Sequence, residues 1–203
     1  MREEIGGFLF HRGWLDLAAQ QKMLADIRGV IAAAPLVRPV TAWGKPMSVR
    51  MSSAGRLGWV IERGRYAYSP RHPETGQKWP PIPESVLAVW RALSCWPDPP
   101  DSCLINWYGE GARMGLHQDR DEGRFDAPVL SISLGDPARF RIGGTERKGR
   151  TQSTVLRSGD VAIMGGKARL AFHGIDRIMF GEGTLLPKGG RINLTLRVVA
   201  PAS

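Results

Sequence analysis

The last regular segment of the chain, residues 191–199, constrains the fold more than any other. It reads Arg-Ile-Asn-Leu-Thr-Leu-Arg-Val-Val, with polar and apolar side chains in strict alternation up to its end. Alternation with a period of two is typical of a β-strand that buries one face. The aliphatic side chains would therefore face a core, while Arg191, Asn193 and Arg197 would share the opposite face.

Two helical segments and a series of short strands are expected along the chain. Residues 16–34 form an amphipathic pattern that begins with Leu17 and ends at Pro35, and residues 83–93 open with proline and glutamate. Helices followed by closely spaced strands predict an α+β, mainly β domain, namely a double-stranded β-helix (jelly roll) with N-terminal supporting helices. The expected strands are 103–108, 129–134, 139–142, 153–156, 160–164 and 191–199.

Composition limits the class of protein. With 203 residues the chain is the size of one domain, and no apolar run approaches the length of a membrane span. The N-terminus does not resemble a signal peptide, so we expect a cytoplasmic protein, and we infer no obligate partner and expect a monomer. Cys95 and Cys103 are expected to be buried thiols. The net charge of +9 favours a polyanionic partner such as nucleic acid, although arginine-rich chains also occur without one.

Residues 37–83 combine aromatic and basic side chains in an irregular, Gly- and Pro-rich segment. Such a mixture is typical of surfaces that stack a base and hold phosphates, although a loop packed over a sheet by its own aromatic residues would have the same composition. The side chains concerned are Trp43, Trp59, Tyr66, Tyr68, Trp79, Arg50, Arg56, Arg63, Arg65 and Arg71.

Three side chains from two separated segments form a potential metal site. His117 and Asp119 stand two residues apart, which directs both to one face of an extended segment, and His173 follows a second short apolar run. Two histidines and one carboxylate leave coordination positions open, as in non-haem Fe(II) oxygenases, and the two arginines of the last strand suit a small dicarboxylate. Singly, the histidine would more often be a core residue and the strand a half-solvated sheet face. Their combination favours the metal site.

The chain resembles the AlkB-type family of Fe(II)- and 2-oxoglutarate-dependent dioxygenases, which remove alkyl groups from nucleic-acid bases. The resemblance runs from about residue 47 to residue 199, and Asn106-x-Tyr108 narrows it from the oxygenase superfamily to the AlkB type. It departs at Met164, where relatives have tryptophan, and it is loose before residue 47. The matching segments are 57–59, 66–70, 103–108, 116–122, 127–135, 172–175 and 191–197.

The resemblance implies Fe(II) as the metal and 2-oxoglutarate as the cosubstrate. His117, Asp119 and His173 would be the metal ligands. Arg191 would bind the cosubstrate carboxylate far from the metal, and Arg197 would contact the end near it. The remaining cosubstrate contacts would come from Leu104, Asn106, Tyr108 and Asn193.

The same resemblance implies a catalytic jelly-roll core over about residues 103–199 and a nucleotide-recognition lid over about residues 37–83, within one domain. The substrate would be alkylated single- or double-stranded DNA, or RNA, with lesions such as 1-methyladenine and 3-methylcytosine. The products would be the repaired base, succinate, CO2 and formaldehyde. Asp121 would face the cationic base in catalysis. The other expected substrate-binding residues are Trp59, Tyr66, Tyr68 and Arg147, with Arg113 and Arg120 as nucleic-acid contacts.

Three other functions remain open at the level of sequence. A related 2-oxoglutarate oxygenase acting on a protein or a small molecule would keep the iron site without the basic, aromatic segment. A metal-free nucleic-acid-binding sandwich would bind no Fe(II) at all. A zinc hydrolase would leave the two arginines of the last strand without a ligand.

Overall fold

The alternating C-terminal segment forms strand β13 (Arg191–Arg197), in the middle of an antiparallel seven-stranded sheet. The computed structural model describes residues 1–41, 43–62 and 64–199. β13 pairs with β8 (Val129–Gly135) on one side and with β6 (Ser102–Tyr108) on the other. The sheet order is β1-β2-β11-β8-β13-β6-β3. Its other strands are β1 (Arg2–Ile5), β2 (Phe8–His11), β3 (Arg50–Gly55) and β11 (Val161–Met164).

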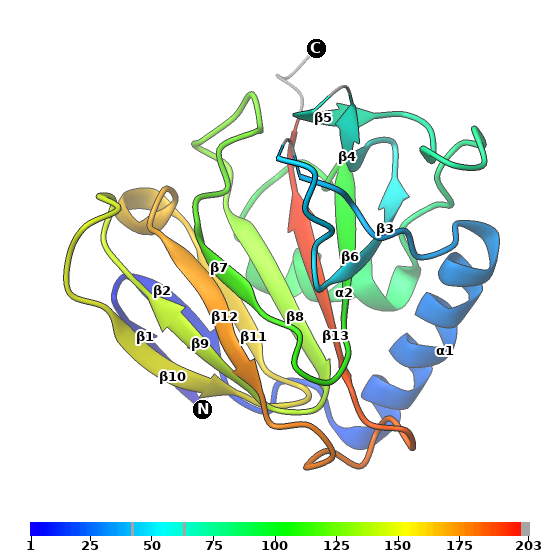
Figure 1. The fold of residues 1–203 in the computed structure, drawn as a ribbon. Helices are drawn as coiled ribbons and strands as arrows, with labels where there is room; N and C mark the ends of the chain where they lie inside the picture. The colour runs from blue at the N-terminus through cyan, green and yellow to red at the C-terminus, as the bar shows by residue number, and fades with distance from the viewer. Residues whose placement is uncertain (42, 63, 200–203) are drawn as a thin grey trace.

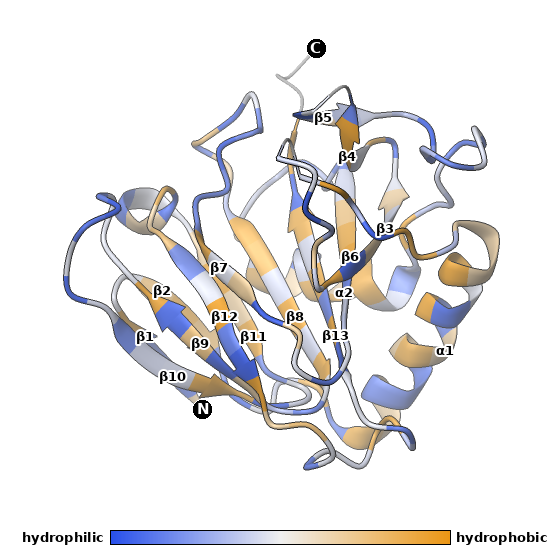
Figure 2. Cartoon of the chain, in the orientation of Figure 1, coloured by the Kyte–Doolittle hydropathy of each residue, from blue (hydrophilic) through white to orange (hydrophobic). Residues whose placement is uncertain are grey.

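A second sheet of four strands packs against the first and has the order β10-β9-β12-β7 (Figure 1). Ala138, Phe140 and Ile142 of β9 point into the core between the sheets, whereas Arg139 and Arg141 lie on the outer side. This alternation is visible as orange and blue along β9 in Figure 2, while β8 is mostly hydrophobic. The strands of this sheet are β7 (Met114–His117), β9 (Ala138–Ile142), β10 (Gln152–Leu156) and β12 (His173–Ile178).

Two helices, α1 (Leu17–Ala33) and α2 (Glu84–Leu93), cover the other face of the large sheet. Asp16 caps α1 by accepting a hydrogen bond from the Ala19 N–H. The buried residues of both helices join the aliphatic side chains of β13 in one core. The helices, the six expected strands and the jelly-roll class are therefore confirmed. Among the described residues, no helix has the combination of length and hydropathy that crossing a membrane needs.

Several expectations about the N-terminal part were wrong. Strands precede the helices, because β1 and β2 form a hairpin whose second strand pairs with β11. Leu17 is exposed rather than part of the buried stripe, since it stands at the first turn of α1. Cys95 is exposed, and only Cys103 is a buried thiol.

Residues 37–83 contain more regular structure than their composition indicates. β3 extends the large sheet beside β6, and β4 (Gly58–Glu62) and β5 (Arg65–Ser69) form a separate hairpin. Figure 1 shows this hairpin above the ends of β6 and β13. Arg63 lies outside the described residues. The large sheet thus draws β1, β2 and β3 from outside residues 103–199.

Candidate metal centre and cavity

The antiparallel pairing of β7 and β12 brings the two candidate histidines together. His117 ends β7 and His173 begins β12, and the two are direct partners in the register. The strands approach closely because Gly174 has no side chain: a Cβ there would lie 2.5 Å from the carbonyl oxygen of Met114. The imidazole centroids are 4.5 Å apart as a result. Sequence spacing alone could not predict this juxtaposition.

Asp119 completes the cluster from the loop that follows β7. Its two carboxylate oxygens lie 3.7 Å from His117 Nε2 and 3.9 Å from His173 Nε2. Each histidine directs Nδ1 at the carbonyl oxygen two residues earlier, of Gly115 in one case and Ala171 in the other. Nδ1 therefore carries the proton, and the Nε2 lone pairs point at the carboxylate. Among the described residues, this is the one cluster of His, Cys, Asp or Glu side chains with metal-site geometry.

The charge states of the cluster suit a cation. Burial raises the pKa of Asp119, but the Arg197 guanidinium and the two imidazoles outweigh it and bring that pKa below its usual range. Burial, reinforced by the nearby His117, lowers the pKa of His173 to about 4. At neutral pH the carboxylate is therefore ionised and His173 is neutral, which are the forms that ligate a metal.

A cavity of about 590 Å³ opens beside the cluster, between the two sheets and the β4–β5 hairpin. Asn193, Thr195 and Arg197 of β13 line it, so the polar face of the alternating strand is turned toward the cavity. Two serines of β8 support this face: Ser131 accepts a hydrogen bond from Asn193, and Ser133 accepts one from Arg191. Leu104, Asn106 and Tyr108 of β6 form the adjoining wall.

Arg191 differs from the other five expected cosubstrate residues because it is fully buried and does not line the cavity. It lies beside Tyr108, its register partner, and burial lowers its pKa to about 10. Its guanidinium donates to Ser133 Oγ at 2.7 Å and to the Asp136 carbonyl oxygen at 3.3 Å, both neutral acceptors.

Comparison with known proteins decides the family. The model of the 2OG-Fe(II) oxygenase superfamily matches residues 7–197. The chain belongs to this superfamily. It is 53% identical over 193 residues to a Caulobacter vibrioides protein named alpha-ketoglutarate-dependent dioxygenase AlkB homolog, covering 95% of this chain and 88% of the relative. The family is therefore AlkB-type, as the sequence resemblance predicted.

Two further comparisons support the family. A solved structure titled "The structure of OsALKBH1" superposes with a TM-score of 0.81 at 29% identity, covering 97% of this chain and 99% of that one. A protein of Arabidopsis thaliana named DNA N(6)-methyladenine demethylase ALKBH1D is 41% identical over 110 residues, which is 48% of this chain and 24% of the relative.

The residues of this oxygenase fit Fe(II) and 2-oxoglutarate, the two cofactors in the name of its superfamily. The cluster of His117, Asp119 and His173 offers the two-histidine, one-carboxylate set that binds Fe(II). Three buried atoms of the expected cosubstrate residues lack a hydrogen-bond partner among the described residues: Asn106 Oδ1, Arg191 Nε and Arg197 Nη1. Two of these atoms are guanidinium nitrogens, which the carboxylates of 2-oxoglutarate would satisfy.

The β4–β5 hairpin presents aromatic side chains at the cavity. The rings of Trp59 and Tyr66 stack with centroids 5.1 Å apart, and the Trp59 indole N–H donates to Asp121 Oδ2 at 3.0 Å. Tyr68, the register partner of Trp59, also lines the cavity, but its hydroxyl donates to Glu122 Oε1 at 2.6 Å. Burial raises the pKa of Tyr68, so this hydroxyl stays protonated.

Two of the three arginines expected to contact nucleic acid or substrate line the cavity. Arg120 and Arg147 are exposed and line the cavity, and the exposed indole of Trp43 adds to the same lining. Arg113 is exposed but lies outside the cavity lining, where its backbone bonds Ser48. Met164, where the sequence departs from the family, lines the cavity wall.

Sequence reasoning did not assign roles to Glu122, Arg169, Ser131 or Ser133. Glu122 is a buried carboxylate on the Asp119 loop, and Arg169 is a buried arginine that donates to it. The two serines bond the polar face of β13. Glu122 could have been noticed as the third acid of the segment 116–122. The role of Arg169 could not be predicted, because the residue follows a turn and belongs to no regular sequence pattern.

Proposed function

We propose that this protein oxidatively dealkylates N-alkylated bases in DNA or RNA, with Fe(II), O2 and 2-oxoglutarate. The observation that carries the proposal is the position of the three candidate metal ligands. They lie beside a cavity that is also lined by stacked aromatic rings and a carboxylate. The names of the AlkB homologue and of the DNA demethylase support nucleic acid as the substrate.

Each expected site residue has a proposed role. His117, Asp119 and His173 would hold Fe(II), which with O2 and 2-oxoglutarate would supply the oxidant for hydroxylation of the N-methyl group, with succinate, CO2 and formaldehyde as the other products. Arg191 and Tyr108 bind the far carboxylate of the cosubstrate, and Arg197 contacts the end near the metal. Asn106 and Asn193 add hydrogen bonds, and Leu104 forms the apolar wall.

Residues 37–83 act as the nucleotide-recognition lid over a core of residues 103–199. A methyl group on the pairing edge is inaccessible in a stacked helix, so the base enters flipped out or from a single strand. Trp59, Tyr66 and Tyr68 border the base, and Asp121 faces its positive charge in lesions such as 1-methyladenine and 3-methylcytosine. The remaining contacts to nucleic acid are Arg113, Arg120 and Arg147. We further propose that the protein acts as a cytoplasmic monomer.

The test uses oligonucleotides that carry a single methylated base, incubated with Fe(II), ascorbate and 2-oxoglutarate and then weighed by mass spectrometry. The expected product has lost one methylene per lesion, and Asp119→Ala serves as the inactive control. Succinate formation without any change in oligonucleotide mass would contradict the proposal and would favour an oxygenase of proteins or small molecules.

A further inference from the structure

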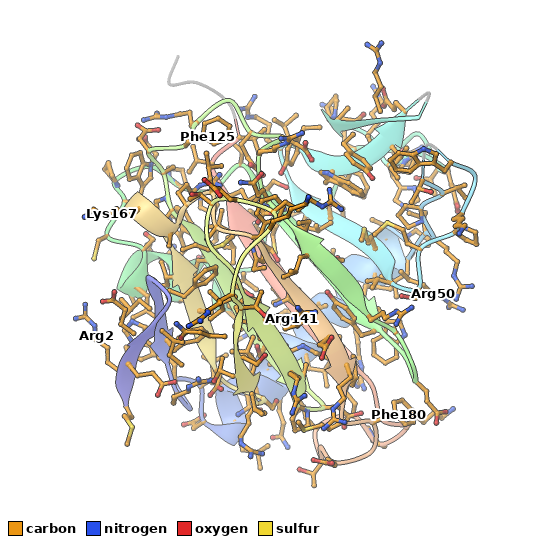
Figure 3. All side chains as sticks on the ribbon, turned by 60° about the vertical axis from the view of Figure 1, so that its left-hand side comes forward. Arg2, Arg50, Phe125, Arg141, Lys167 and Phe180 are labelled. Carbon is orange, nitrogen blue, oxygen red and sulfur yellow. The ribbon has the colours of Figure 1, made fainter. Side chains whose placement is uncertain are left out.

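One buried arginine joins both ends of the loop that carries Asp119. Arg169 directly follows a short 3-10 turn, Gly166–Ala168, and is 3% exposed. Its guanidinium donates from Nη1 to the Asp119 carbonyl oxygen at 2.6 Å and from Nε to the Ala127 carbonyl oxygen at 2.9 Å. The guanidinium also lies over the ring of Phe125 at 5.5 Å. Figure 3 shows Phe125, on the loop, and Lys167, on the turn, on the same side of the molecule.

The same guanidinium begins a row of alternating buried charges. Arg169 Nη2 bonds Glu122 Oε2 at 3.2 Å, Glu122 Oε1 pairs with Arg197 Nε at 3.1 Å, and Arg197 Nη2 bonds Asp119 Oδ2 at 2.8 Å. All four side chains are nearly inaccessible to solvent. The row is neutral as a whole, which is the condition under which buried charges are tolerated.

We propose that Arg169 and Glu122 are positioning residues for the metal ligand Asp119 and for Arg197. Arg169 holds the loop between Asp119 and Ala127 so that the Asp119 carboxylate faces the two imidazoles. Arg197 donates from both Nε and Nη2 to Asp119 Oδ2, and Glu122 Oε1, 3.1 Å from Nε, holds the guanidinium in this orientation by a second ion pair. Nη1, which has no hydrogen-bond partner among the described residues, is then left for the cosubstrate. The inference rests on the proposed function, since it concerns the same metal and cosubstrate.

Charge balance distinguishes this role from simple packing. Loss of Arg169 alone leaves two carboxylates to share Arg197, so Arg197 is drawn toward Glu122 and the loop is released. Neutralising Glu122 as well restores the balance of the row. The double variant Arg169→Met/Glu122→Gln should therefore bind metal more tightly than Arg169→Met. If the two residues only packed, the losses of binding free energy from the two substitutions would add, and the double variant would bind more weakly.

The experiment measures Mn(II) binding to the full-length chain without nucleic acid, by isothermal titration calorimetry. Arg169→Met should bind Mn(II) about tenfold more weakly or worse, as for other residues that orient metal ligands. Arg91→Met is the matched control, because Arg91 is an exposed arginine of α2 paired with Glu84 and should bind Mn(II) like the parent protein. Co(II) absorption adds a second readout, since a displaced Asp119 changes the ligand field.

Folding is checked by circular dichroism in every variant. If Arg169→Met does not fold, Arg169→Lys replaces it; this variant keeps the charge but cannot reach all three acceptors, and it should also bind Mn(II) more weakly. Parent-like Mn(II) affinity in a folded Arg169 variant, or strictly additive losses in the double variant, would overturn the inference alone. Failure of the parent protein to bind Mn(II) would instead overturn the proposed function, and the inference with it.

Discussion

Arg191→Met should abolish most of the affinity for 2-oxoglutarate while leaving the folded state about as stable as before. Arg191 is fully buried, and its hydrogen-bond acceptors among the described residues are neutral. Burial lowers its pKa to about 10, and the nearby Tyr108, Asp160 and Asp136 offset only part of this lowering. The charge is therefore undercompensated until a carboxylate binds. Methionine is close in volume and removes both the charge and its desolvation penalty.

The magnitudes follow from these contacts. A charge-assisted hydrogen bond contributes roughly 1.5–3 kcal/mol, so a bidentate carboxylate pair loses about 3 kcal/mol, or roughly a hundredfold in Kd. Removing Arg191 relieves the cost of burying its charge, and the two lost hydrogen bonds of Arg191 offset part of that gain. The unfolding free energy should then change by about 1 kcal/mol or less, which is a shift of roughly 2–4 °C in Tm.

The assay is calorimetric titration of 2-oxoglutarate into the Mn(II)-loaded protein, combined with thermal unfolding with and without the cosubstrate. Arg177→Met, at an exposed arginine of β12, is the control and should change neither quantity. Retention of parent-like 2-oxoglutarate affinity in Arg191→Met would refute the assignment. A large fall in Tm with retained cosubstrate binding would show that Arg191 has a structural role instead.

Three further outcomes are expected. Asp119→Ala should abolish turnover and Mn(II) binding together, measured by succinate release and calorimetry; residual metal-dependent turnover would contradict the ligand assignment. Trp43→Ala should weaken binding of a methylated oligonucleotide but not turnover of a methylated mononucleotide, because its 84% exposed indole borders the cavity mouth, and Trp14→Ala, at an exposed indole that does not line the cavity, should change neither. The unfolding free energy of the metal-free protein should fall from pH 6.5 to pH 4, because the pKa of His173 is lowered to about 4 and only the unfolded chain takes up that proton. Chemical denaturation at several pH values measures this slope, and a His173→Asn variant with an unchanged slope would exclude His173 as its source.

The sequence by itself determined the elements whose burial follows a regular period. The alternation of residues 191–197 predicted which side chains of β13 face the aliphatic core and which face the opposite side, because a shift of one residue would turn every aliphatic side chain away from the core. The sequence did not show that the polar face is buried as well, against the cavity between the two sheets. The 3.6-residue pattern likewise predicted α1 to within a residue at each end. Leu17 was the exception, since the first turn of a helix can project beyond the core.

The short strands near the N-terminus could not be predicted because their stability comes from distant partners. β2 is only four residues long and pairs with β11, about 150 positions later in the chain, and β3 forms the sheet edge beside β6. No local pattern encodes such pairings. Within residues 37–83, the aromatic and arginine content also concealed β3, β4 and β5.

The candidate site divides in the same way. The spacing of His117 and Asp119 predicted that both side chains lie on one face, because residues i and i+2 share a face in an extended chain. Only the tertiary structure decided that β12 lies against β7 and brings His173 to them, and only it showed Arg169 holding the Asp119 loop. The physical reason is that the partners of a buried charge are brought to it by the packing of distant segments. In the sequence these partners stand far apart, and no local pattern connects them.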